Sequence, residues 1–154
     1  MALAIGDKAP EFSLPGSGGA VISLAGCHGK AVVLYFYPKD DTPGCTNEAK
    51  GFTAMVADFK AANAIILGAS KDTAAKHDKF IEKHALDVAL ISDEEGALME
   101  AYGVWVEKNM YGRKYMGIER ATYLIDAKGI IRQIWRKVRV KGHVEAVLEA
   151  AKAL

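Results

Sequence analysis

Apolar residues along the chain fall into strand-length runs separated by segments with a helical period. The strongest run, Ala31–Tyr37, is apolar at both alternating sets of positions, which predicts a central strand covered on both faces. Ala64–Ala69 and Val88–Ile91 predict two further buried strands. Near the end of the chain, Thr122–Asp126 and Ile130–Arg136 predict two strands joined by a tight turn at 127–129.

Helical periods lie between these strands. Downstream of Cys45, apolar residues spaced by three and four predict one amphipathic helix on the sheet: Ala49, Phe52, Val56, Phe59 and Ala62. Thr73–His84 predicts a helix with a polar outer face, on which we expect His77 and His84 to be solvated. A final helix is predicted by the apolar stripe Val144, Val147, Leu148 and Ala151.

Two segments carry more local signals. Phe12–Leu14 and Val21–Leu24 predict short strands joined by the glycine-rich turn 15–19, an entry hairpin before the first buried strand. Ser92, with Glu95 three residues later, predicts a capping box for a helix that ends near Gly103.

Residues 104–117 have no clean period, although they are rich in aromatic residues and methionine. We expect this segment to be a flap that covers the mouth of a pocket. A partner-binding surface is the alternative.

A strand–helix–strand pattern early and an antiparallel hairpin with a closing helix late predict an α/β protein. The expected architecture is a thioredoxin-like fold: a central mixed sheet flanked by helices, with an N-terminal strand extension. The sequence contains no internal repeat or low-complexity linker, and 154 residues suit one core. We therefore expect a single domain over residues 1–154.

Composition narrows the classes of function. The content of 51% hydrophobic and 25% charged residues is that of a globular protein, and a net charge of +1 does not favour nucleic acid or an anionic membrane as partner. No apolar run approaches the roughly 20 residues that span a bilayer. The N-terminus lacks the basic start and long apolar core of a signal peptide. With only two cysteines, these features predict a cytoplasmic protein.

The chemistry concentrates in residues 35–45. Pro38 cannot donate to a strand ladder and marks the end of the strand, whereas Thr42 and Pro43 predict the N-cap and first residue of a helix. Cys45 then lies among unpaired backbone N–H groups at the positive end of the helix dipole, which favours a nucleophilic thiolate. The alternative is a buried, inert cysteine. Polar neighbours and the cap spacing argue against burial.

The segment from Pro38 to Cys45 has the Pro-x-x-x-Thr-x-x-Cys pattern of the peroxiredoxins. More narrowly, the chain resembles the bacterioferritin comigratory protein, or PrxQ, subfamily, which is AhpC/TSA-like. The resemblance covers nearly the whole length, and its further matching segments are 6–12, 33–38, 45–49, 110–116 and 120–126.

The resemblance implies a thiol-dependent peroxidase that reduces hydrogen peroxide and organic hydroperoxides without a cofactor. Cys45 would be the peroxidatic cysteine that becomes a sulfenic acid. Thr42 would hydrogen-bond the thiolate and the peroxide, and Pro38 would shield the pocket. Arg120 would face the sulfur, where a fixed positive charge favours the ionised thiol.

Two alternatives for the charged residues stay open at this point. Without the resemblance, Arg120 would be taken for a surface ion-pair partner, for example of Glu119. Glu48 could reach Arg120, but we rank an acid of the first helical turn, favoured by the dipole, slightly higher.

A resolving cysteine is not evident. Members of the subfamily place it five residues after the peroxidatic one, here Lys50, or in the following helix, where the alignment puts Ile81. The other cysteine, Cys27, precedes the strand that Cys45 follows, and about 20 Å of strand would separate them. A disulfide needs Cα atoms within about 7 Å. We therefore expect a one-Cys mechanism with Cys27 not resolving.

This mechanism requires an external thiol reductant: thioredoxin, glutaredoxin or a low-molecular-weight thiol. A monomer is expected from the subfamily, with a weak homodimer as the alternative.

Other functions are less well supported. A thioredoxin-like disulfide reductase is disfavoured because the chain has no Cys-x-x-Cys. No metal site is predicted, since the set Cys27, His28, Cys45, His77 and His84 lacks the short spacing of structural zinc sites. The remaining alternative from a different class is a non-enzymatic chaperone or interaction domain with a thioredoxin fold.

Overall fold

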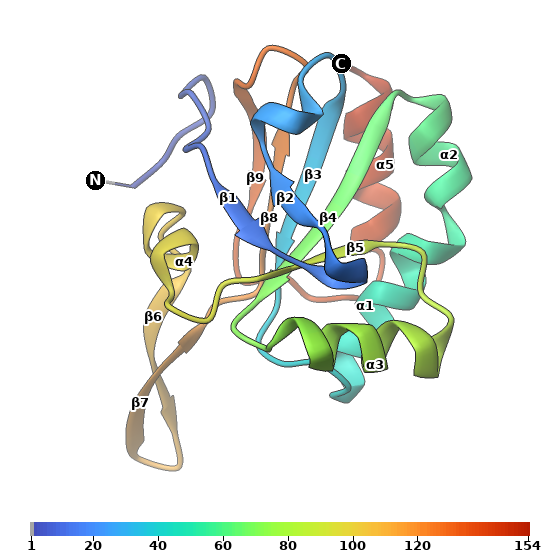
Figure 1. The fold of residues 1–154 in the computed structure, drawn as a ribbon. Helices are drawn as coiled ribbons and strands as arrows, with labels where there is room; N and C mark the ends of the chain where they lie inside the picture. Colours follow the sequence, from blue (N-terminus) through green and yellow to red (C-terminus); the bar gives the residue numbers. More distant parts are fainter. Residues whose placement is uncertain (1) are drawn as a thin grey trace.

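The computed structural model describes residues 2–154, and a five-stranded mixed sheet forms its centre (Figure 1). The strand order is β5-β4-β3-β8-β9, with β3 parallel to β4 and antiparallel to β8. β4 is parallel to β5, and β8 is antiparallel to β9. The bounds are β3 Ala31–Phe36, β4 Ala64–Ser70, β5 Ala89–Ser92, β8 Ala121–Ile125 and β9 Ile131–Trp135. The predicted strands and fold class are confirmed.

Two apolar cores lie on the two faces of this sheet. Alternate residues of β3 point into each core, so that all six of its residues are buried, as the apolar run predicts. One core is covered by α1 Pro43–Ala54, α2 Val56–Ala61, α3 Ala74–His84 and α5 His143–Lys152. The other is covered by α4 Ala97–Ala101 and by the N-terminal hairpin of β1 Ser13–Pro15 and β2 Val21–Ser23.

The prediction of one helix that carries the apolar stripe from Ala49 to Ala62 is wrong in one respect, because the segment forms two helices. Met55 leaves the helical conformation (φ −109°, ψ 10°) and separates α1 from α2. Gly51 and Thr53 have low helix propensity and weaken the helix just before the break. A Cβ at Gly51 would lie 3.0 Å from Cγ2 of Val144 on α5, so the glycine permits close helix packing.

The predicted capping box is also wrong. α4 begins after Gly96, whose φ of +83° favours glycine, and its first N–H groups are bound by Asp93. The buried Asp93 carboxylate accepts from Leu98 N–H at 3.3 Å and from Met99 N–H at 2.9 Å. The Ser92 hydroxyl cannot cap the helix because it ends β5 and donates to the carbonyl of Asp72.

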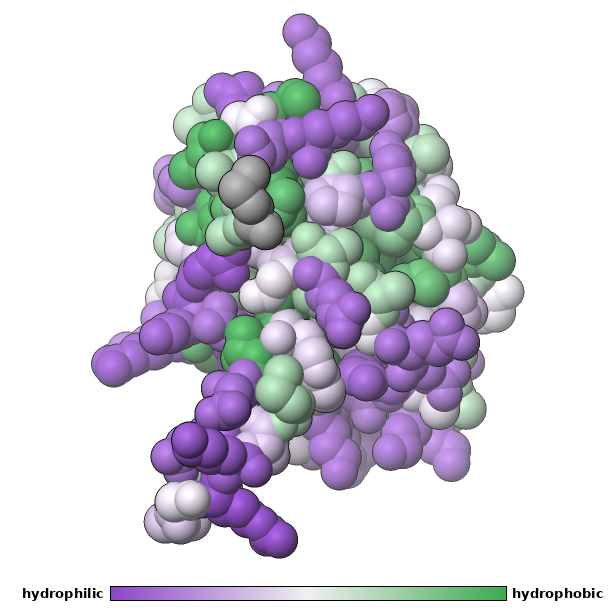
Figure 2. Space-filling view, turned by 90° about the vertical axis from the view of Figure 1, so that its left-hand side faces the viewer, coloured by the Kyte–Doolittle hydropathy of each residue, from purple (hydrophilic) through white to green (hydrophobic). Residues whose placement is uncertain are grey.

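Residues 104–117 contain a β-hairpin, β6 Trp105–Met110 with β7 Arg113–Ile118, which projects from the body of the molecule (Figure 1). Tyr111 and Gly112 form its turn with φ of +53° and +78°, as primed hairpin turns require. Much of the hairpin is exposed on both faces, so no alternation marks it in the sequence. Figure 2 shows that the lower end of this side of the molecule is predominantly hydrophilic.

Within residues 2–154, none of the helices has the length and apolar character that crossing a membrane requires.

Gly68 of β4 is expected to be intolerant of a side chain. A Cβ there would lie 2.7 Å from Cζ of Tyr35 and 2.8 Å from Cδ2 of Leu90, both in the core. Gly68→Ala should lower the free energy of unfolding by about 1–3 kcal/mol in urea titrations, as overpacking of a core does. Gly117→Ala is the control, because its Cβ would meet the flexible Lys108 side chain. Equal stability of the Gly68 variant and wild type would contradict this account of the core.

Candidate active site

Cys45 is the third residue of α1, at the helix end that faces the loop 37–42. Thr42 is in the N-cap position with an extended backbone (φ −97°, ψ 155°), and its carbonyl accepts from Thr46 N–H at 2.8 Å. The predicted helix start is therefore confirmed. The Thr42 hydroxyl does not cap the helix but donates to the carbonyl of Lys39 at 2.8 Å.

The expectation that Cys45 is not buried is wrong, because the residue is only 2% exposed. It belongs to the core beneath α1, together with Tyr35 and Tyr37 of the neighbouring strand and loop. Asp41 and Asn47 are exposed, whereas the third helical position turns toward the sheet. Its Sγ is nevertheless not in an apolar setting, since Nη2 of Arg120 donates to it at 3.3 Å.

Arg120 comes from the short connection between β7 and β8 and bridges two groups of α1. Its Nη2 contacts Cys45 Sγ, and its Nη1 donates to Oε1 of Glu48 at 2.6 Å. The alternative pairing of Arg120 with Glu119 is wrong, as is the preference for Glu48 as an acid of the first helical turn that does not reach Arg120. Glu119 lies 3.8 Å from Arg136 instead.

Gly44 makes room for this bridge. A Cβ at position 44 would lie 3.2 Å from Nη2 of Arg120, so a side chain there would crowd the guanidinium that contacts the sulfur.

Burial dominates the electrostatics of the partner acid. Glu48 is fully buried, and burial raises the pKa of its carboxyl to about 7 although the charge of Arg120 acts in the opposite direction. Burial would lower the pKa of Arg120, but the charges of Glu48 and Cys45 raise it, so the guanidinium stays charged. Within residues 2–154, Oε2 of Glu48 and the hydroxyl of Tyr35 have no hydrogen-bond partner.

The other residues singled out in the sequence are placed as follows. Pro38 lies two residues after the end of β3 and is exposed. Its shielding role and the contact of Thr42 with the thiolate stay predictions.

The prediction that His77 lies on a solvated face is wrong, because His77 is completely buried beside Asp40. One signal in the sequence indicated this burial. His77 lies three residues before the apolar Phe80, so both side chains are on the inner face of α3.

Cys27 lies far from Cys45 along the central strand. It ends a short 3-10 helix, Ala25–Cys27, before β3, whereas Cys45 comes after β3. The six residues of β3 alone extend about 20 Å. Both cysteines are free thiols, and burial raises the pKa of Cys27. Lys50 is exposed on α1, and Ile81 packs partly buried against the core.

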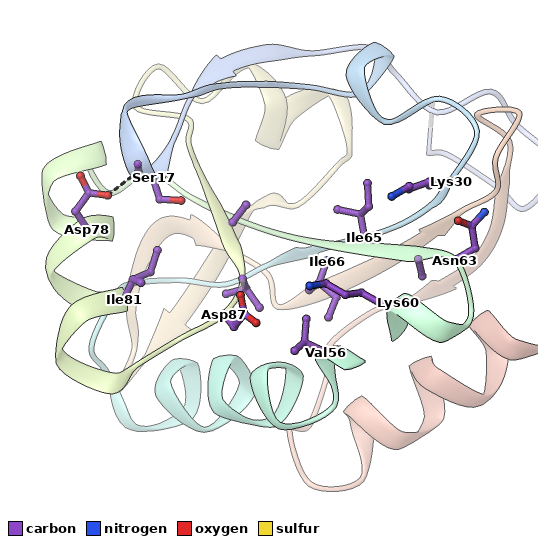
Figure 3. Close-up of a pocket in the computed structure, with 14 residues that line it drawn as sticks. Ser17, Lys30, Val56, Lys60, Asn63, Ile65, Ile66, Asp78, Ile81 and Asp87 are labelled. Atoms are coloured by element: carbon purple, nitrogen blue, oxygen red, sulfur yellow. Dashed lines mark hydrogen bonds between the residues drawn. The ribbon is translucent and has the colours of Figure 1, made fainter. Parts of the chain in front are cut away.

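A cavity of about 670 Å³ lies at the sheet edge between α2, α3 and the starts of β4 and β5 (Figure 3). Ile65, Ile66, Ile81 and Val88 give it an apolar wall, and Lys30 and Lys60 reach into it from one side. None of its lining residues belongs to the Cys45 site.

Among residues 2–154, no three His, Cys, Asp or Glu side chains are arranged to hold a metal ion.

A thioredoxin-like fold that places a thiol at a helix N-terminus beside a half-buried guanidinium defines a thiol-based oxidoreductase. The family model described as "AhpC/TSA family" matches residues 5–134. A Coxiella burnetii protein named "Putative peroxiredoxin bcp" is 49% identical, with 96% of this chain and 98% of that protein covered. "Peroxiredoxin Bcp" of Bacillus subtilis is 48% identical, with 99% and 97% covered.

Among solved structures, the Xanthomonas campestris bacterioferritin comigratory protein matches with a TM-score of 0.88 at 46% identity, covering 92% of this chain and 90% of that one. That structure was solved as a trapped intermediate/ligand complex, for insight into alkyl peroxide reduction by the Xanthomonas protein. The chain belongs to the AhpC/TSA family, as a peroxiredoxin of the bacterioferritin comigratory protein group. The predicted thiol-dependent peroxidase is thus confirmed, and the relatives do not favour the non-enzymatic alternative.

Glu48 should make stability depend on pH. Its pKa of about 7 in the folded protein exceeds the ordinary 4.5, so the folded protein binds more protons than the unfolded chain between these values. Its contribution to stability is therefore complete below pH 4.5 and lost as pH rises through 7. Relative to Glu48→Gln, the free energy of unfolding of wild type should fall by about 3 kcal/mol over this range.

Urea titrations at closely spaced pH values measure this difference. Glu149→Gln, on the exposed side of α5, is the control and should show no such slope. Parallel pH profiles for wild type and Glu48→Gln would show that folding does not raise the pKa of Glu48.

Proposed function

We propose that Cys45 is the peroxidatic thiol and that Arg120 is its electrostatic partner. The contact of 3.3 Å between Arg120 Nη2 and Cys45 Sγ is the observation that carries this assignment. The thiolate attacks one peroxide oxygen, the O–O bond breaks, and Cys45 becomes a sulfenic acid. The second oxygen leaves as hydroxide or alkoxide and takes a proton from solvent to become water or an alcohol. The guanidinium favours the thiolate before the step and offers donors to the departing oxygen during it.

Glu48 holds the guanidinium in this position. The bond of 2.6 Å to Arg120 Nη1 leaves Nη2 turned toward the sulfur, so one planar group serves both partners. We assign Thr42 as the hydroxyl that binds thiolate and peroxide, and Pro38 as the residue that shields the pocket. The resemblance supports both roles, and so does the position of Thr42 at the N-cap, three residues before Cys45.

The substrates proposed here are hydrogen peroxide and organic hydroperoxides. The alkyl peroxide reduction activity named for the Xanthomonas campestris relative supports the second class. The β6–β7 hairpin is proposed as one edge of the pocket mouth. Burial and then the charge of Arg120 lower the pKa of Lys108 on β6, and the charge of Cys45 also acts on it, which supports an approach of the hairpin to the site.

The cycle is proposed to be of the one-Cys type. Cys27 lies beyond the length of β3, and Lys50 and Ile81 occupy the positions where the subfamily carries a resolving cysteine. The sulfenic acid would therefore be reduced by thioredoxin, glutaredoxin or a low-molecular-weight thiol. We further propose that residues 1–154 act as one domain, as a monomer, in the cytoplasm.

Substitution of the two cysteines separates their roles. Cys45→Ser should abolish peroxide consumption, whereas Cys27→Ser should keep thiol-dependent turnover near the wild-type rate. Mass spectrometry after one equivalent of peroxide should find a sulfenic acid at Cys45, trapped with dimedone. An intramolecular disulfide, or loss of turnover in the Cys27 variant alone, would refute the one-Cys cycle.

Arg120→Ala should reduce the thiolate fraction of Cys45 because a positive charge leaves its side. Alkylation by iodoacetamide, followed against pH in a Cys27→Ser background, should shift its midpoint upward, and peroxide consumption should slow by about 10²-fold. Arg136→Ala, which removes an arginine paired with Glu119 and not with Cys45, is the control. An unchanged pH profile in the Arg120 variant would remove Arg120 from the site.

A further inference from the structure

The loop before α1 is attached to the rest of the protein through one buried side chain, Asp40. Its Oδ2 lies 2.7 Å from Nδ1 of His77 on α3, and its Oδ1 accepts from the hydroxyl of Tyr37 at 2.6 Å. His77 is 0% exposed and Asp40 9%. The other nitrogen of the imidazole, Nε2, lies 2.9 Å from the carbonyl of Ile91 in β5.

These contacts indicate which ring nitrogens of His77 carry a hydrogen. A carbonyl oxygen only accepts, so Nε2 of His77 carries a hydrogen for Ile91. The carboxylate of Asp40 already accepts from Tyr37, and an ionised carboxylate accepts at both oxygens. Nδ1 then also carries a hydrogen. His77 and Asp40 consequently form an imidazolium–carboxylate ion pair that is closed to solvent.

The backbone of the same residue is fixed as well. Asp40 N–H donates at 2.8 Å to Oδ2 of Asp72, which also accepts from the hydroxyl of Ser70 at 2.7 Å. Both partners lie at the end of β4, before α3. Asp40 lies two residues before Thr42 and five before Cys45, and it is thus held by α3, β4 and β5 together.

Stability alone does not account for such a pair. Replacement of a buried ion pair by apolar residues is often neutral or stabilising, so its presence indicates a geometric requirement. The pair fixes the geometry of the loop 38–42, which supplies the N-cap of the helix that carries Cys45.

Asp40 also belongs to the charge environment of the site. Burial raises the pKa of Tyr35 well above its usual range, and the charges of Glu48, Cys45 and Asp40 raise it further, while Arg120 lowers it. Tyr35 is stacked on Tyr37 with 5.5 Å between ring centroids, and Tyr37 is bonded to Asp40. Asp40 and Cys45 thus both act on the buried hydroxyl of Tyr35, and a carboxylate left unpaired at position 40 would add a like charge to the surroundings of the thiol.

We propose that His77 is a positioning residue of the peroxidase site, which fixes the loop 38–42 through Asp40 and cancels the charge of this carboxylate, five residues before Cys45. The proposal rests on the assignment of Cys45 as the reacting thiol. The charged groups around the site come from four elements. Arg120, from the segment before β8, contacts the thiol, and Glu48 of α1 contacts Arg120. Lys108 of β6 interacts with the charge of Cys45, and Asp40 of the loop acts with Cys45 on Tyr35. His77 is the group that neutralises the last of them.

The test is the pH dependence of Cys45 alkylation by iodoacetamide in a Cys27→Ser background. His77→Leu should shift the midpoint upward by about one unit, so that alkylation below the midpoint is about tenfold slower. Asp40→Asn combined with His77→Leu should return the midpoint to near the parental value, because no carboxylate is left unpaired. A purely structural role would change thermal stability without this rescue.

His77→Asn is a second variant in case the leucine variant does not fold. It keeps an N–H for Asp40 but not the charge, and a shift of about half the size is expected. The matched control is His84→Asn, because His84 lies on the same helix and bonds to Asp41 of the same loop, 42% exposed. Its midpoint should remain parental.

Two results would overturn the proposal: a parental midpoint in every folded His77 variant, or no rescue by Asp40→Asn. Neither touches the proposed function, whose failure would appear separately as peroxide consumption by Cys45→Ser.

Discussion

One guanidinium organises the chemistry of this protein. Arg120 stands between a fully buried carboxyl and a nearly buried thiol, at 2.6 Å from Glu48 and 3.3 Å from Cys45. An arginine cannot lose its proton in a protein, so its charge is a fixed quantity that acts on both neighbouring groups. The raised pKa of Glu48 follows from this arrangement, because burial acts against the charge of the acid more strongly than Arg120 favours it.

The scaffold brings these groups together from distant parts of the sequence. The loop 37–42 and α1 follow β3 in the sequence. The antiparallel neighbour of β3, β8, begins one residue after Arg120. Phe36 pairs with Ala121, so the register of β3 and β8 places the arginine beside the end of β3. Gly44 then leaves space for the guanidinium to reach the sulfur. The site is thus a direct product of strand pairing in the centre of the sheet.

The fold was largely predictable because its signals are local. Apolar runs marked the strands of the central sheet, and proline and threonine marked the start of α1. Partners of polar groups were not predictable, since Glu48–Arg120 and Asp40–His77 join residues 72 and 37 positions apart. Polarity in the sequence suggested that Cys45 and His77 were exposed, but each is buried because a distant ion or hydrogen-bond partner satisfies it. The β6–β7 hairpin was missed because much of it has no buried face.

The separation of Cys27 from Cys45 by the length of β3 has a kinetic meaning. In a one-Cys cycle each turnover consists of two successive encounters with different molecules, which predicts ping-pong kinetics. Between the two encounters, the reductant and a second peroxide molecule compete for the sulfenic acid. Reaction with the second peroxide would oxidise it irreversibly to the sulfinic acid. The ratio of reductant to peroxide around the molecule, rather than any property of the folded chain, would then decide how many cycles one copy completes before it is inactivated.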